Sequence, residues 1–152
     1  MLFKKDTPTI DIKEVTLKKK YPFMYENFVV SSQRTLYVLL EESNDKIDAL
    51  KFDLILFKYG YPNDEVSHPL DKFGLGSYGF FEVANSEWIK EIRNINKSHP
   101  RHTDSLFDKD KHYIAKFKDV TIEIICTEFE EVELTKEDLI NFLTEQISYL
   151  KK

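Results

Sequence analysis

The sequence predicts an α+β fold in a single domain across residues 1–152, with a mainly antiparallel sheet and two principal helices at about 86–98 and 136–150. A length of 152 residues, 41% of them hydrophobic and 32% charged, is typical of one globular domain. Short β-branched and aromatic runs follow one another with only two helical segments among them, which favours an antiparallel sheet over alternating βαβ units. The pattern leaves open whether the sheet curls into a partial barrel.

The first predicted elements are strands. Apolar residues alternate imperfectly over residues 10–17, and residues 36–40 and 50–57 are β-branched and aromatic runs of strand length. Residues 80–83 form a further short apolar run. Four strands are therefore expected before the first helix.

The first helix is predicted from its start signal, its apolar stripe and its stop signal. Asn85 or Ser86 can cap the first turn by accepting a hydrogen bond from a backbone amide. Apolar side chains then recur at helical spacing, at Trp88, Ile89, Ile92 and Ile95. Pro100 ends the helix, because the residue before a proline disfavours the α conformation.

Two alternating segments, residues 113–117 and 120–126, predict a β-hairpin that turns at Lys118 and Asp119. A two-residue turn pairs residue 115 with residue 122 and residue 113 with residue 124. This register places the apolar side chains of both strands on one face. Cys126 lies on that face, so we expect its thiol to be buried and unreactive.

The second helix is predicted from a capping pattern in which Asp138 follows Thr135 at the third position. One packed face is expected from the apolar stripe that follows, which consists of Leu139, Leu143, Ile147 and Leu150. The acidic run between residues 128 and 138 is expected to be a solvated edge that leads into the helix.

Composition excludes several classes of function. With 22 Lys and Arg against 27 Asp and Glu, the formal net charge of −5 disfavours binding to nucleic acid or anionic membranes. The single cysteine cannot form an intramolecular disulfide, and the first residues, Met-Leu-Phe-Lys-Lys, lack the apolar stretch of a signal peptide. No apolar run approaches the ~20 residues of a membrane helix. We expect a cytoplasmic protein without nucleic-acid or membrane partners.

The segment most suggestive of function is the loop of residues 60–79. It is long, holds all four glycines, and carries enough apolar residues, such as Val66, Leu70 and Leu75, to pack on the sheet. Residues 74–79 match the G-x-G-x-x-G pattern, but a strand follows where a dinucleotide site needs a helix. Turn glycines are therefore favoured over nucleotide binding. The loop is either an ordered connection or a functional element.

All four histidines lie between residues 68 and 112. His99 and His102 have the spacing of some metal ligands, and His68 could complete a three-histidine site for a divalent metal, with Asp119 or Glu82 as a catalytic base. Two other interpretations remain open. The histidines could form a metal-free ligand or acid/base site, or they could be separate surface residues.

A series of short motifs runs through residues 60–125, namely His68-Pro69-Leu70, Gly74-Leu75, Tyr78, Glu82-Val83, Asn85-Ser86, Trp88-Ile89, His99, His102, His112-Tyr113-Ile114, Phe117 and Asp119. In these motifs the chain resembles an uncharacterised bacterial protein family that has no assigned activity. That family has Phe-His-Asp-Ser at the hairpin turn, where residues 117–120 of this chain read Phe-Lys-Asp-Val. The resemblance indicates a region of interest rather than a reaction.

The sequence contains no complete catalytic constellation, and the first hypothesis is a small binding or interaction protein without catalysis. The 60–79 loop and the 99–102 turn would form its surface for a protein or small-molecule partner, with contributions from His68, Tyr78, Asn85, Trp88, His99 and His102. The alternative is a metal-dependent hydrolase with His68, His99 and His102 as ligands. A further alternative is an acidic inhibitor or immunity-type protein, whose acidic edge would bind a basic partner.

Overall fold

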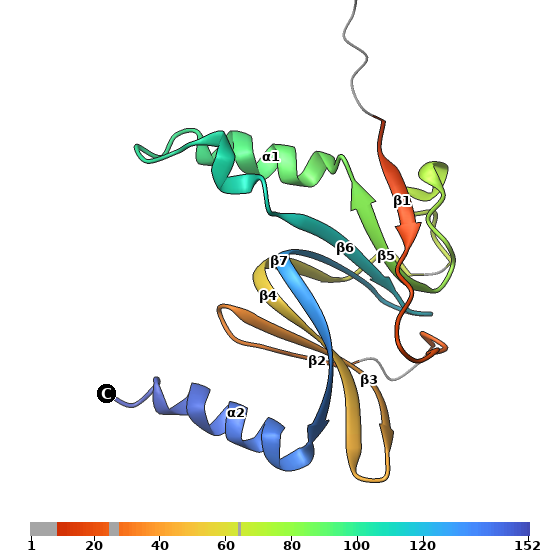
Figure 1. The fold of residues 1–152 in the computed structure, drawn as a ribbon, viewed down its shortest axis with the longest axis vertical. Coiled ribbons are helices and arrows are strands. Elements are labelled where there is room, and N and C mark those ends of the chain that lie inside the picture. Colours follow the sequence, from red (N-terminus) through yellow and green to blue (C-terminus); the bar gives the residue numbers. More distant parts are fainter. Residues whose placement is uncertain (1–8, 25–27, 64) are drawn as a thin grey trace, which may run out of the picture.

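The computed structural model describes residues 9–24, 28–63 and 65–152. In these residues the main feature is a seven-stranded antiparallel sheet (Figure 1). The strands are β1 (Asp11–Glu14), β2 (Phe28–Ser31), β3 (Thr35–Ser43), β4 (Lys46–Gly60), β5 (Gly79–Ala84), β6 (Lys111–Lys116) and β7 (Thr121–Thr135). Their order in the sheet is β1-β5-β6-β7-β4-β3-β2. Because the edge strands β1 and β2 each pair with one neighbour, the sheet is open and does not close into a barrel.

Both predicted helices are confirmed, as α1 (Glu87–Asn96) and α2 (Lys136–Ser148). Ser86 is the cap of α1, and its Oγ accepts a hydrogen bond from the Ile89 amide at 3.2 Å. Thr135 and Asp138 form the reciprocal capping box of α2, with hydrogen bonds of 2.8 and 3.1 Å. Within the described ranges, neither these helices nor any other has the length and hydropathy needed to cross a membrane.

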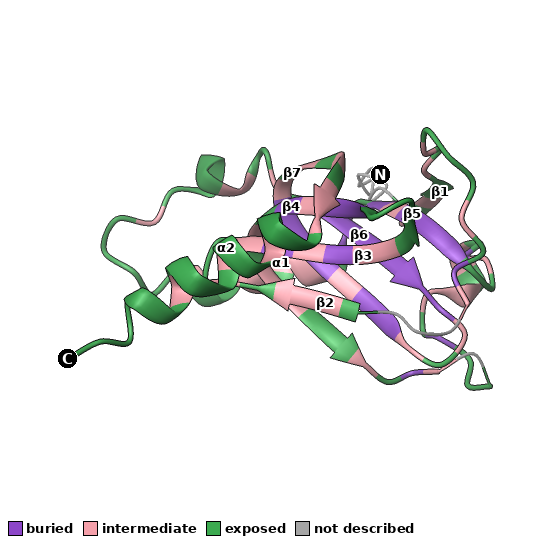
Figure 2. Ribbon diagram, turned by 90° about the horizontal axis from the view of Figure 1, so that it is seen from below, coloured by how far each residue is buried: buried purple, intermediate pink, exposed green. Residues whose placement is uncertain are grey.

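The register of the predicted hairpin is confirmed. Ala115 lies opposite Ile122, Tyr113 lies opposite Ile124, and the Phe117 amide donates to the Val120 carbonyl at 2.8 Å. The apolar face of the hairpin belongs to the main core, which occupies the buried centre of the sheet (Figure 2). Cys126 is fully buried in this core, as predicted.

Phe52 of β4 is the centre of the aromatic part of this core. It is fully buried, and its ring centroid lies 5.9 Å from those of Phe80 and Phe129 and 6.2 Å from that of Tyr113. These residues come from four different strands, so the cluster joins β4, β5, β6 and β7. Aromatic pairs at such spacing add to the stabilisation from burial alone.

The opposite face of the hairpin is covered by the 60–79 loop, which packs on the sheet as predicted; Asp64 lies outside the described residues. Leu75 is buried against Phe81 and Ile114. Gly76 permits this approach, because a Cβ atom there would lie 2.8 Å from the Phe81 ring. Gly79 has a φ of +138°, which side-chain-bearing residues rarely adopt. These positions support the prediction of turn glycines.

The long strands and the edge strand depart from the predicted ranges. β4 extends beyond residues 50–57 at both ends, and the acidic run predicted as a solvated edge is mostly the second half of β7. There Glu128 and Glu130 are exposed while Phe129 between them is half-buried, so one face of this half of the strand is exposed to solvent. β2 was not predicted, because four residues at a sheet edge leave little pattern.

The packed face predicted for the second helix is wrong for most of its length. Leu143, Ile147 and Leu150 are 48%, 58% and 77% exposed. The helix is anchored by Phe142, whose ring stands edge-on to Tyr37 at 5.3 Å, and then extends away from the sheet (Figure 1). Helical periodicity identifies an apolar face but does not show whether the same chain supplies a partner for it.

Candidate functional site

A cavity of about 500 Å³ lies between loop residues 61–62 and 66–70, the first turn of α1 and the sheet. Its apolar walls include Ile10, Pro62, Val66, Leu70, Val83 and Trp88, and Tyr61 also lines it. The described residues of its polar lining are Lys58, Ser67, His68, Glu87, His112 and Glu123. A mostly apolar cavity of this size with a few converging polar groups has the properties of small-molecule sites.

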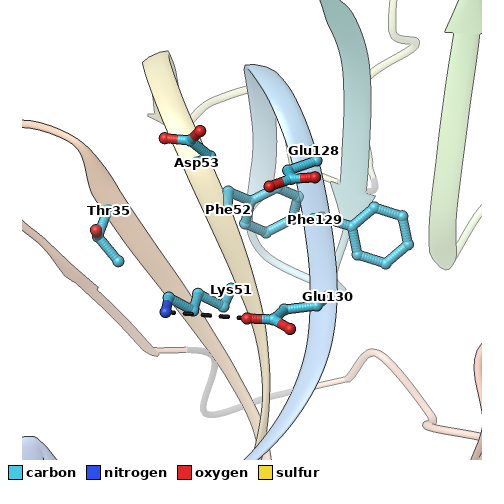
Figure 3. A pocket seen from close by; sticks show the side chains of 7 residues that line it. All are labelled: Thr35, Lys51, Phe52, Asp53, Glu128, Phe129 and Glu130. Atoms are coloured by element: carbon cyan, nitrogen blue, oxygen red, sulfur yellow. Dashed lines mark ion pairs between the residues drawn. The ribbon is translucent and has the colours of Figure 1, made fainter.

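A second depression, of about 330 Å³, lies on the twisted ribbon of β4 and β7 (Figure 3). Its polar lining includes the exposed carboxylates of Asp53, Glu128 and Glu130, and Glu130 faces Lys51 at 3.9 Å. Exposed charges of this kind interact mainly with water. The cavity beside α1 is therefore the better candidate for a binding site.

Two buried histidines hold Glu123 at the floor of this cavity. His112 Nε2 of β6 lies 3.0 Å from Glu123 Oε1, and His68 Nε2 of the loop lies 3.3 Å from Glu123 Oε2. Burial would raise the pKa of Glu123, but the hydrogen bonds from His112 and His68 outweigh it and hold the pKa at about 2. The carboxylate is therefore charged at neutral pH and uses both oxygens as acceptors.

The remaining hydrogen bonds assign the protonation of each imidazole. The Leu70 amide donates to His68 Nδ1 at 3.0 Å, so the proton of a neutral His68 must be on Nε2, which faces Glu123. His112 Nδ1 lies 2.7 Å from Ser86 Oγ. Because Ser86 Oγ already accepts from the Ile89 amide, its own O–H can donate to His112 Nδ1. The network is satisfied with both rings neutral.

These bonds connect four elements around the cavity: Ser86 at the start of α1, His112 on β6, Glu123 on β7 and His68 in the loop. The order serine, histidine, carboxylate is that of a hydrolytic triad. Ser86 is only 5% exposed, however, and its oxygen is occupied as the helix cap. Its hydroxyl is thus placed to position His112 rather than to attack a substrate.

The single tryptophan forms one wall of the cavity. The Trp88 ring stands edge-on to the His112 ring with centroids 5.3 Å apart, and Lys58 Nζ lies 4.1 Å from the Trp88 ring centroid. Lys58 and Glu123 are directly opposite in the β4–β7 register, yet Glu123 turns to the histidines and Lys58 to the ring. Both charges stay at the cavity without forming an ion pair with each other.

The structure brings two of the six predicted site residues to this cavity, namely His68 and Trp88. Tyr78 lines a different groove, together with residues 14–21, 23, 79 and 80. The Asn85 side chain donates to the Thr9 carbonyl at 2.9 Å. None of the described residues that line the cavity comes from the 99–102 turn.

The other predicted metal ligands have local partners. His102 lies 2.9 Å from Asn96 Nδ2 and 2.8 Å from Asp104 Oδ1, and exposed His99 accepts from the Arg101 amide at 3.1 Å. Among the residues that the structure describes, no three His, Cys, Asp or Glu side chains are arranged to hold a metal ion. The three-histidine metal site and its hydrolase activity stay predictions.

Sequence reasoning missed Lys58 and Glu123 and left His112 without a role. The contact between His112 and Glu123 could have been predicted, because the predicted hairpin register already places residues 112 and 123 on one face as diagonal neighbours.

Comparison of the chain with protein-family models, with curated proteins and with solved structures finds no match. The resemblance to an uncharacterised bacterial family therefore also stays a prediction, and the geometry of the cavity is the observation from which a function can be argued.

Proposed function

We propose that this protein binds a small molecule, without catalysis, in the cavity beside α1. The observation that carries the proposal is a mostly apolar cavity of about 500 Å³ whose floor is fixed by the hydrogen bonds of His68, Glu123 and His112. A floor whose side chains are already held by hydrogen bonds between two strands, the cap of α1 and the loop needs little ordering when a ligand binds, which lowers the entropic cost of binding. We place this activity in the cytoplasm, as the composition predicts.

The chemistry of the floor supports binding over catalysis. A general base works best when its pKa lies near the working pH, whereas the pKa of Glu123 is held at about 2. Both oxygens of Glu123 and both nitrogens of each histidine are engaged in hydrogen bonds. Proton transfer through either histidine would require one of these hydrogen bonds to break. The hydrolase and inhibitor hypotheses have no comparable support from the cavity.

A thermal-shift screen with a library of small organic fragments tests the proposal. A ligand present at about 100 times its Kd stabilises the native state by about 2.7 kcal/mol, which raises the Tm of a domain of this size by about 5–10 °C. Val66→Phe should fill part of the cavity and remove these shifts. Ile55→Phe, an exposed β4 position that does not line the cavity, is the matched control and should keep them.

The proposal fails if no fragment stabilises the wild-type protein. It also fails if the fragments that stabilise wild type stabilise the Val66→Phe variant equally, because they would then bind elsewhere.

A further inference from the structure

We infer that the ligand of this cavity is an organic carboxylate with an apolar body, and that Lys58 binds its carboxylate group. The inference rests on the proposed function and adds the chemical class of the ligand. It depends on which charged side chains of the cavity already have polar partners, on the position of Lys58 Nζ and on the apolar walls.

Among the described residues, three charged side chains line the cavity, and two of them have partners. Glu87 forms an ion pair with Lys90 at 3.0 Å, and both oxygens of Glu123 face histidine nitrogens. Lys58, in contrast, contacts the face of the Trp88 ring and has no carboxylate within ion-pair distance among the described residues. Lys58 is therefore the charged group of this lining whose ammonium donors are not engaged by another described side chain, and it is available to an anionic group of a ligand.

The surroundings of Lys58 keep its ammonium group at the cavity. Side chains of opposite charge that face each other on antiparallel strands can form a stabilising ion pair, and Glu123 is the residue opposite Lys58. Glu123 instead faces the two histidines, and each of its oxygens accepts a hydrogen bond from one imidazole. The Trp88 ring then holds Nζ at 4.1 Å by a cation–π contact, and such a contact leaves N–H donors for an anion.

The apolar walls of the cavity favour a ligand whose carboxylate group is attached to a hydrocarbon chain or ring. Ile10, Val66, Leu70 and Trp88 offer hydrocarbon surface without hydrogen-bonding partners except for the indole N–H. A polar body would lose its hydrogen bonds to water on entering, whereas an apolar body gains free energy from burial. A cationic ligand would meet Lys58 directly. A carboxylate on a hydrocarbon chain or ring satisfies both features of the site.

Three probes that share one hydrocarbon chain test this class: octanoate, octanamide and octylammonium. Trp88 is the single tryptophan of the chain and lines the cavity, so its fluorescence reports binding. We expect a Kd for octanoate about tenfold lower than for octanamide, because hydrogen bonds to a charged group are stronger, and the weakest binding for octylammonium. Lys58→Met should make octanoate and octanamide bind alike, and Lys58→Arg should retain the preference.

Lys51→Met is the matched control, because Lys51 also lies on β4 but lines the other depression. It should leave the tenfold preference unchanged. Equal binding of octanoate and octanamide to wild type, or a preference that survives in Lys58→Met, would overturn the ligand class and leave the proposed function standing. If no probe changes the fluorescence of Trp88, or if Val66→Phe responds as wild type does, the binding function of the cavity is overturned as well.

Discussion

Replacement of Glu123 by glutamine tests the network that forms the floor of the cavity. The pKa of this carboxyl falls from the usual 4.5 to about 2 in the folded protein, and its side chain is only 17% exposed. One pKa unit corresponds to 1.36 kcal/mol, so the native network favours the charged over the protonated carboxyl by about 3 kcal/mol. Glutamine is close in shape to the protonated form. We therefore expect Glu123→Gln to lower the free energy of unfolding at pH 7 by about 3 kcal/mol.

The pH dependence of this difference follows from the direction of the shift. Because the folded pKa lies below the unfolded one, the stabilisation is fully present above the unfolded value of 4.5 and is lost as the pH falls toward about 2. The difference between wild type and Glu123→Gln should thus be constant from about pH 7 to pH 5. It should shrink below pH 4.5, where the wild-type carboxyl begins to bind a proton in the unfolded chain.

Urea denaturation followed by circular dichroism measures this difference at each pH. Glu130→Gln is the matched control, because Glu130 lies on the same strand with a side chain 66% exposed and a long contact of 3.9 Å to Lys51. It should change the free energy of unfolding by less than about 0.5 kcal/mol. The reasoning would be refuted by a Glu123→Gln protein as stable as wild type at pH 7, or by a difference that stays constant below pH 4.5.

Two further substitutions and one labelling reaction test the packing of the core and the cap of α2. Phe52→Ala should lower the free energy of unfolding in urea by about 3–5 kcal/mol, because the ring is fully buried among three others, and a loss below about 1 kcal/mol would contradict that placement. Thr135→Ala should cost about 1 kcal/mol through loss of the α2 cap, and full stability of this variant would show that the cap contributes nothing. Burial raises the pKa of Cys126 to about 12, so an aromatic disulfide reagent should label the thiol in urea but not in the native protein at pH 7, and rapid native labelling would show that the thiol is accessible.

The parts of the fold that could be predicted depend on contacts close in the sequence. The hairpin of β6 and β7 follows from two alternating segments and a turn of two residues, and its register leaves only one face for the apolar side chains. The starts of both helices follow from Ser86 and Thr135, because a cap bonds an amide within the same turn. Local patterns of this kind are complete within one short stretch of the chain.

The parts of the fold that differ from the prediction depend on contacts with segments distant in the sequence. The stripe of α2 has the spacing of a buried face, yet Ile147 and Leu150 are mostly exposed and line an open groove with the polar residues 32–34. The reverse holds for Lys116, which has the charge of a surface residue but is 5% exposed. It is covered because the loop brings Asp71 to within 3.4 Å of its ammonium group. Elements distant in the sequence therefore decide both the exposure of the α2 stripe and the burial of Lys116.

The candidate site combines a contact that could be predicted from the sequence with contacts that could not. His112 and Glu123 are diagonal neighbours in a hairpin whose register the sequence predicts, so their meeting on one face could have been inferred. His68 could not have been added in the same way, because it lies 55 residues before Glu123 in a loop without a periodic pattern. Lys58 reaches the cavity through the pairing of β4 with β7, which again joins distant segments. A glutamate on a strand therefore becomes a candidate for function only when the register, the covering loop and the opposite strand are considered together.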